Sequence, residues 1–129
     1  MFVDGASKGN PGPAGIGVVL MDEHGAMIAE IAEPLGETTN NVAEYRALIR
    51  GLEECIKFRA ASVTVNTDSQ LLARQMEGKY KINAPHLRAL YNDAHVLCKQ
   101  FIKGVKFEHV LRAGNARADQ LANEGCRKN

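Results

Sequence analysis

The pattern of apolar and polar positions along the chain begins with three predicted strands. Residues 1–7, 15–21 and 27–33 have the pattern of strands, the second of them apolar and β-branched. The segments between them, 8–13 and 22–25, contain the turn residues Gly, Pro, Asn and Asp. Runs of this kind with turn residues between them are typical of strands joined by short loops. Connections this short predict an antiparallel meander.

After this meander the pattern alternates between helical and strand periodicity. Apolar positions at helical spacing predict helices over residues 42–58, 69–77, 84–101 and 116–127. Alternating or continuous apolar runs predict two further strands over residues 62–66 and 105–111. Helical crossovers place these two strands parallel to the first, so the expected fold is an α/β protein with a mixed five-stranded sheet and helices packed on it. Chemistry in such sheets gathers at the carboxyl ends of the parallel strands.

Length and composition limit the classes of protein to consider. The 129 residues fit a single domain spanning 1–129, with 45% hydrophobic and 24% charged residues. The apolar stretch Ala14–Met21 is too short to span a membrane, and no basic segment followed by an apolar one suggests a secretory signal. The three cysteines have neither disulfide nor zinc spacing. We therefore expect a cytoplasmic monomer with no membrane partner.

Charge is distributed unevenly along the chain. Residues 1–73 contain five Lys or Arg against ten Asp or Glu, whereas residues 74–112 contain eight against three. An acidic half beside a basic half is compatible with a cation site next to a surface that binds a polyanion.

Two acidic residues stand at positions that do not suit them. Asp4 lies in an apolar strand, where Asp is a poor strand former, although it also precedes Gly5 as a turn-initiating Asp would. Glu44 falls on the helix face of Leu48 and Cys55 rather than on the charged face. A carboxylate on that face is costly to desolvate unless a partner or a metal compensates. The alternative for Glu44 is a local capping box with Asn41, which has the required spacing.

Two further acids occupy the ends of predicted elements. Asp68 follows a strand and precedes a helix, where helix capping is a sufficient explanation by itself. Asp119 lies in the first turn of the last helix, where the helix dipole favours a carboxylate. The combination suggests more, because Asp4, Glu44, Asp68 and Asp119 come from four separate elements that meet at one end of the sheet. Convergent carboxylates are the ligands that hard divalent cations require.

Amide and hydroxyl side chains accompany these acids, and several stand beside them in short motifs. The segments are Phe2-Val3-Asp4-Gly5-Ala6-Ser7 with Gly9-Asn10-Pro11-Gly12, Thr38-Thr39-Asn40-Asn41-x-x-Glu44, Thr67-Asp68-Ser69-Gln70, and Asn115-x-Arg117-Ala118-Asp119. In this order, over essentially the whole length, the sequence resembles the type 1 ribonuclease H family. With no Trp and a short segment at residues 78–83, it resembles the compact form that lacks the basic protrusion.

The resemblance implies an endonuclease that hydrolyses the RNA strand of an RNA/DNA hybrid and leaves 3′-hydroxyl and 5′-phosphate ends. It implies that the four acids hold two Mg²⁺ or Mn²⁺ ions, which activate water and stabilise the leaving oxygen. Some compact relatives also cut double-stranded RNA, so this substrate remains an alternative. The implied substrate-binding residues are Asn10, Asn40, Asn41 and Gln70 on the RNA strand and Thr39 at a DNA phosphate.

One departure concerns a histidine that many family members carry in the loop after the fifth strand. The corresponding segment here reads Leu111-Arg112-Ala113-Gly114-Asn115 and has no histidine. Arg112 is the best substitute, as a permanent cation that can meet a phosphate but cannot shuttle protons. His109 is the alternative, although it shares a strand face with Val105 and Phe107 and is expected to be packed.

Overall fold

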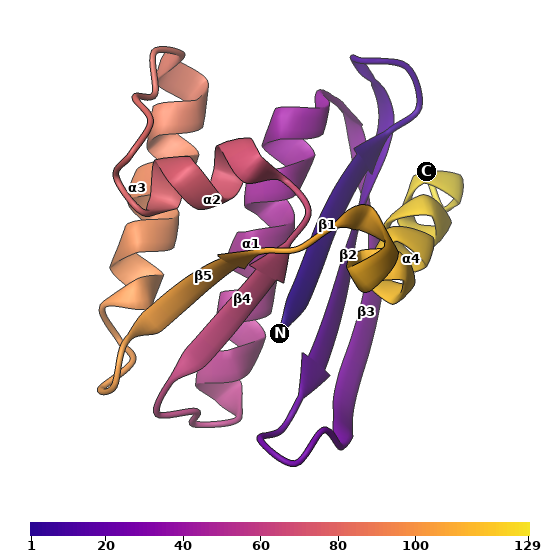
Figure 1. Cartoon of the computed structure of the whole chain (residues 1–129). Coiled ribbons are helices and arrows are strands. Elements are labelled where there is room, and N and C mark those ends of the chain that lie inside the picture. Colours follow the sequence, from indigo (N-terminus) through magenta and orange to yellow (C-terminus); the bar gives the residue numbers. More distant parts are fainter.

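A five-stranded mixed sheet forms the centre of the computed structural model, which describes residues 1–129 (Figure 1). The strands are β1 (Phe2–Ser7), β2 (Gly12–Met21), β3 (Met27–Thr38), β4 (Val63–Thr67) and β5 (Val105–His109). Their order across the sheet is β3-β2-β1-β4-β5. β1, β2 and β3 pair antiparallel, whereas β4 is parallel to β1 and β5 is parallel to β4. The predicted α/β architecture is thus confirmed.

Helices cover both faces of the sheet. They are α1 (Asn40–Lys57), α2 (Gln70–Met76), α3 (Pro85–Cys98) and α4 (Ala116–Arg127), with a 3₁₀ turn at Arg112–Asn115. α1 packs on β1 and β2 on one face, with α3 against its outer side, and α4 packs on β1, β2 and β3 on the opposite face (Figure 1). Residues 77–84 join α2 to α3 without a helix, as expected for the compact form. None of the helices combines the length and apolar character that crossing a membrane requires.

The two faces of β2 bury different apolar clusters, because successive side chains of a strand point to opposite sides. Val18 packs into the larger core with Tyr45 and Leu48 of α1. Its neighbour Val19 packs into a smaller core with Leu121 of α4. The continuous apolar run of β2 is therefore the signature of a strand buried on both sides.

Glycine positions in β2 allow α4 to approach the sheet closely. A Cβ atom at Gly17 would overlap the carbonyl oxygen of Ala118, and one at Gly15 would overlap the backbone of Cys126. The contact on the α4 side is also made by small residues, including Ala122 and Gly125. This close packing fixes the position of α4, and with it the carboxylate of Asp119 in its first turn.

Several element boundaries differ from those predicted. β2 begins at Gly12 and β3 continues to Thr38, so the predicted turn segment is partly strand. The backbone N–H of Lys8 donates to the carbonyl of Pro13 at 2.8 Å, which closes a tighter turn than the sequence indicates. Pro34 is tolerated because β3 is an edge strand with only one neighbouring strand, so that the N–H missing from proline need not be used in the sheet. α3 also ends three residues earlier than predicted, at Cys98.

Candidate active site

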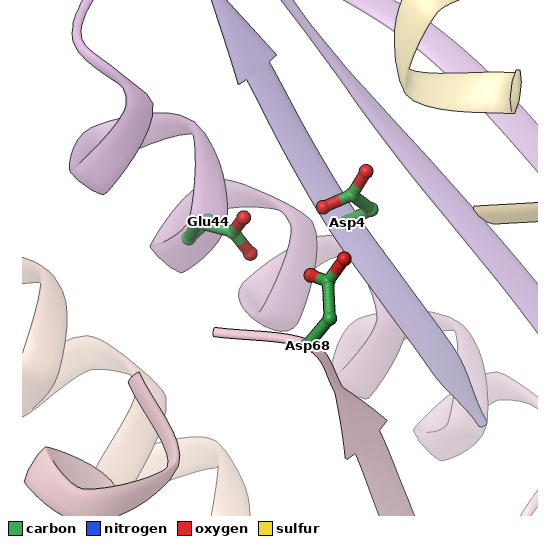
Figure 2. Close-up of side chains that lie close together, drawn as sticks. All are labelled: Asp4, Glu44 and Asp68. Atoms are coloured by element: carbon green, nitrogen blue, oxygen red, sulfur yellow. The ribbon is translucent and has the colours of Figure 1, made fainter. Parts of the chain in front are cut away.

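Three carboxylates from three elements meet at the carboxyl end of β4. Figure 2 shows Asp4 on β1, Glu44 on α1 and Asp68 directly after β4, with their side chains directed toward one another. One oxygen atom of each carboxylate lies within 4.8 Å of the corresponding atoms of the other two. The predicted convergence of these three acids is therefore present in the fold.

The close contact between β1 and α1 is what brings Glu44 to Asp4. A Cβ atom at Gly5 would overlap the backbone of Ala43 and the backbone nitrogen of Glu44. Only a residue without a side chain permits this approach. The glycine that follows Asp4 therefore determines how near the second carboxylate lies, and it is not there to make a turn, since Gly5 lies within β1.

The side chain of Glu44 does not cap its own helix. Thr39 is the N-cap of α1, and its hydroxyl accepts a hydrogen bond from the backbone N–H of Val42 at 3.3 Å. The capping box with Asn41 is thus not formed. Instead, the Oε2 atom of Glu44 is buried without a hydrogen-bond partner. A buried, unpaired carboxylate oxygen is costly, so this atom fits a ligand position.

Helix capping does not explain Asp68 either. Ser69 is the N-cap of α2, and its hydroxyl accepts from the backbone N–H of Leu72 at 3.1 Å. Asp68 itself is half-buried and follows Thr67, the last residue of β4. Its position beside Asp4 results from the parallel pairing of β1 with β4.

Asp119 flanks this group rather than joining it. It lies in the first turn of α4, is half-buried, and lines the same cleft as the other three acids, a cleft with a volume of about 450 Å³. The group of mutually close oxygen atoms contains Asp4, Glu44 and Asp68 but not Asp119. The only cation within 4 Å of its carboxylate is Arg112, whose Nη2 atom lies 4.0 Å away on a largely exposed side chain. The fourth acid thus faces the cleft without being held by a close ion pair.

The electrostatic state of the cleft follows from burial and mutual repulsion. Burial, followed by the nearby charge of Asp68, raises the pKa of Asp4 to about 8, and a hydrogen bond with Asp119 adds to this rise. Burial, followed by the charge of Asp4, raises the pKa of Glu44 well above its usual range. Like charges this close favour the protonated forms unless a cation offsets them.

The donor set fits a divalent cation. All the converging donors are carboxylate oxygens, the ligands that hard cations prefer, and the buried Oε2 of Glu44 has no other partner. No His or Cys belongs to the group, which makes a zinc site a poor match.

The predicted substrate-binding residues lie at helix starts and in one loop. Asn10, in the loop between β1 and β2, accepts a hydrogen bond through Oδ1 from the backbone N–H of Asn40 at 3.0 Å. Asn40 lines the carboxylate cleft, and Asn41 beside it is exposed. Gln70, the first residue of α2, is also exposed. Thr39 uses its oxygen to cap α1, which leaves its hydroxyl hydrogen available as a donor.

The two candidates for the role of the absent histidine differ in position. Arg112 lines the carboxylate cleft on the 3₁₀ turn after β5. His109 was expected to be packed, and this prediction is wrong, because the residue is exposed. It is the last residue of the edge strand β5, beyond the half-buried positions Val105 and Phe107.

Three residues to which the sequence assigned no role also shape the site. Asn115 is 1% exposed, and its Nδ2 donates to the carbonyl of Val3 at 2.9 Å, directly before Asp4. Lys8 and Asn123 line the cleft and contact each other, with 2.6 Å between Nζ and Oδ1. For Asn115, its place in the motif with Asp119 was a usable signal in the sequence. No local pattern joins residues as distant as Lys8 and Asn123.

Comparisons with known proteins agree with this arrangement. A family profile described as "Reverse transcriptase-like" matches residues 2–125. "Bifunctional protein Rv2228c" of Mycobacterium tuberculosis is 46% identical over 122 residues, covering 94% of this chain and 33% of that protein. "Ribonuclease H" of Pseudomonas syringae is 35% identical over 142 residues, covering 97% of this chain and 89% of that protein. The chain thus spans about a third of the length of the mycobacterial relative.

Solved structures are similar over nearly the whole chain. The crystal structure of RNase H1 from Halobacterium salinarum has a TM-score of 0.95 at 42% identity and covers 99% of this chain and 96% of that one. A structure of LC11-RNase H1 in complex with an RNA/DNA hybrid has a TM-score of 0.92 at 44% identity, with 98% and 95% covered.

Proposed function

Because the chain belongs to the type 1 ribonuclease H family, we propose that it is an endonuclease that hydrolyses the RNA strand of RNA/DNA hybrids. The proposed reaction uses two divalent ions, Mg²⁺ or Mn²⁺, and leaves 3′-hydroxyl and 5′-phosphate ends. The observation that carries the proposal is the group formed by Asp4, Glu44 and Asp68, with its buried, unpaired Glu44 oxygen. A relative of 44% identity is described in complex with an RNA/DNA hybrid, which supports the choice of substrate.

The four acids have distinct places in this proposal. Asp4 is the residue in common, because it belongs to the group with Glu44 and Asp68 and lines the same cleft as Asp119. Glu44 and Asp68 would hold an ion together with Asp4, and Asp119 would complete the ligand set. When bound, the two ions supply an activated water and stabilise the leaving 3′-oxygen. The fold contributes the placement, since Asp4, Glu44 and Asp119 lie on a strand or a helix and Asp68 directly follows β4.

Substrate recognition is assigned to the amides around the cleft. Asn10 and Asn40, joined by their hydrogen bond, form a polar ledge at one side of the carboxylates, with Asn41 and Gln70 exposed nearby. Amide side chains both donate and accept, which suits ribose 2′-hydroxyl groups and minor-groove base edges. Thr39 is assigned to a DNA-strand phosphate, through its free hydroxyl hydrogen and the adjacent N-terminus of α1.

Arg112 is assigned a role at the scissile phosphate or at the released product. Its guanidinium lines the cleft and is largely exposed, so it is able to reach a phosphate oxygen. A permanently charged arginine contributes attraction and hydrogen bonds, not proton transfer.

The decisive experiment is cleavage of a hybrid labelled on its RNA strand, with Mg²⁺ and Mn²⁺ tested separately. The RNA strand is expected to be cut internally, and end-group analysis is expected to give 3′-hydroxyl and 5′-phosphate termini. Asp68→Asn removes a charge while keeping the side-chain shape and is expected to lower cleavage at least about 100-fold, as for loss of a group stabilising transition-state charge. Intact RNA with both ions would refute the proposal.

Direct metal titration tests the ligand assignment without relying on activity. Calorimetric titration with Mn²⁺ is expected to give saturable binding that Asp68→Asn weakens strongly. Asp93→Asn, which changes an exposed acid on α3, is the matched control and is expected to bind as the unaltered protein does. Equal binding by both variants would contradict the assignment.

Competition between substrates defines the specificity. We expect double-stranded DNA to remain intact, because the amide ledge recognises riboses on one strand. We expect the hybrid to be cut in preference to double-stranded RNA, because Thr39 is assigned to a phosphate of a DNA strand. Equal cleavage of double-stranded RNA would instead assign it as a second substrate.

The proposal includes a monomer acting in the cytoplasm, in keeping with three unpaired cysteines. Size-exclusion chromatography with light scattering tests the oligomeric state.

A further inference from the structure

Lys8 is held at the edge of the carboxylate cleft by contacts from its backbone and its side chain. Its backbone N–H donates to the carbonyl of Pro13 at 2.8 Å, which fixes the loop between β1 and β2. Its ammonium donates to Oδ1 of Asn123 on α4 at 2.6 Å. Asn123 is itself oriented by a hydrogen bond from its Nδ2 to the backbone carbonyl of Asp119 at 2.9 Å. The cation is thus held in place although it is exposed.

A second groove begins where the carboxylate cleft ends. It has a volume of about 630 Å³ and shares Lys8, Asp119 and Asn123 with the cleft. Its remaining lining residues lie along α4, and all are polar or charged: Gln120, Glu124 and Arg127. The loop between β1 and β2 lies beside this helix (Figure 1). The two hollows share Lys8, Asp119 and Asn123 as lining residues, so Lys8 borders both of them.

Lys8 offers an anion a positive charge that no carboxylate neutralises, where the groove meets the cleft. Lys8 and Arg112 are the two cations that line the cleft. Lys8 lies in the loop between β1 and β2, and Arg112 lies on the 3₁₀ turn after β5. Of the two acids in the groove, Asp119 faces the cation-binding cleft, and Glu124 has its Oε1 atom 4.0 Å from Nη1 of Arg117. The ammonium of Lys8 has no carboxylate partner within 4.0 Å, because its hydrogen-bond partner is a neutral amide. It therefore retains charge and donors for a ligand.

We propose that Lys8, positioned by Asn123, binds the RNA phosphate adjacent to the scissile one, and that the groove along α4 receives the RNA strand as it leaves the carboxylate cleft. This inference rests on the proposed function. Three donors on a compact ammonium suit a backbone phosphate, and one of them is already used by Asn123. The contact reads no base, so it adds affinity without sequence preference.

The first test measures hybrid binding by fluorescence anisotropy in the catalytically impaired Asp68→Asn background, between about 50 and 200 mM salt. Adding Lys8→Ala is expected to weaken binding roughly 3- to 10-fold and to reduce the salt slope by about one, the effect of losing one phosphate contact. Lys8→Arg is expected to retain the slope. Lys57→Ala is the control, because it removes the same charge far from the cleft. Lys57 is the last residue of α1, about 27 Å from the helix start near the cleft, and the variant is expected to bind as the protein with Lys57 does.

The second test locates the contact. In the active protein, a hybrid with one neutral methylphosphonate linkage in the RNA strand is expected to show reduced cleavage at the bond one nucleotide away. Lys8→Ala is expected to abolish that local reduction, because without the ammonium group a neutral linkage binds as well as a charged one at that position.

The outcomes separate this inference from the proposed function. If the unaltered protein cuts the hybrid but Lys8→Ala keeps both the salt slope and the local reduction, the inference is wrong. If Lys8→Ala lowers kcat while binding and the local reduction persist, Lys8 acts only by orienting Asn123 and Asp119, and the phosphate contact is also refuted. If the unaltered protein neither binds nor cuts the hybrid, both proposals fail.

Discussion

The backbone of Ala43 in α1 lies directly against Gly5 in β1, so closely that a methyl group at Gly5 would overlap the carbonyl carbon of Ala43. This contact is made one residue after Asp4 and one residue before Glu44, so it sets the separation of two carboxylates of the cleft. A backbone contact made for packing therefore also determines the geometry of the site.

Gly5→Ala is expected to push α1 away from β1. The overlap involves backbone atoms that cannot rotate away, so the free energy of unfolding is expected to fall by about 1–3 kcal/mol. Mn²⁺ affinity is expected to fall with it, because Glu44 moves with the helix. Thermal unfolding and calorimetric titration measure the two effects. Gly114→Ala is the control, since a Cβ atom there would lie 3.8 Å from its nearest neighbour, and it is expected to leave stability unchanged within about 0.5 kcal/mol. Equal stability of both variants would contradict the argument.

The stability of the metal-free protein is expected to decrease as the pH rises. The pKa of Asp4 is raised from 3.8 to about 8, so the native state binds more protons than the unfolded state between these values. The contribution of Asp4 to the free energy of unfolding therefore falls over this window and levels off above about pH 8. Thermal unfolding in a chelator between pH 5 and 9 measures the trend. A melting temperature that rises across this range would show that the acids are not mutually repelling.

Asp4→Asn is expected to remove much of this pH dependence. The neutral amide relieves the repulsion with Asp68 and Glu44, so the metal-free variant is expected to be more stable at pH 8 by at least about 1 kcal/mol, or roughly 4 °C in Tm. Divalent cations are expected to stabilise the unaltered protein more than this variant, since binding to the native state alone adds stability. Asp93→Asn, on the exposed side of α3, is expected to leave the pH dependence as it is.

Asn115 is expected to be needed for the position of β1. Asn115→Ala leaves the carbonyl of Val3 without its side-chain donor in a buried place, a loss of about 1–3 kcal/mol in stability. Because Val3 precedes Asp4, metal affinity is also expected to decrease. Chemical denaturation and Mn²⁺ titration measure these effects. Asn92→Ala, at an exposed position of α3, is the control. If Asn92→Ala loses as much stability as Asn115→Ala, the buried hydrogen bond of Asn115 is not the cause of the loss.

Arg112 is expected to contribute to turnover through its charge. Arg112→Ala is expected to lower kcat roughly 10-fold, equal to about 1.4 kcal/mol, while Arg112→Lys retains most of the activity. Arg112→His is expected to be more active at pH 6 than at pH 8 relative to the unaltered protein, because histidine loses its charge over this range. Steady-state hybrid cleavage measures kcat, with Lys103→Ala at an exposed position as control. Unchanged kcat in Arg112→Ala would exclude the residue from the reaction.

Local sequence patterns predicted the elements well where a run had one clear period. The predicted helix over residues 42–58 is close to the observed α1, and β4 and β5 are parallel to β1 as expected. The boundaries of β2 and β3 were wrong, because Pro11, Pro13 and Pro34 indicate turns locally. Pro13 and Pro34 lie within strands, where neighbouring strands and an edge position accommodate them.

The acids of the cleft also show which features local sequence patterns could not predict. For Glu44 and Asp68 the sequence left helix capping as an alternative, and only the fold excluded it, since Thr39 and Ser69 occupy the cap positions. The exposure of His109 and the contact between Lys8 and Asn123 were equally beyond local patterns. Each depends on which segments, distant in the chain, become neighbours.

The amino-acid sequence by itself determined the order and type of the elements and the presence of four acids beside them, because hydrophobic periodicity and turn chemistry act over a few residues. The tertiary structure alone decided that Asp4, Glu44 and Asp68 form one group while Asp119 stands at its side. The physical reason is that burial, repulsion and the absence of a partner arise only once strand pairing and helix packing have removed these carboxylates from water.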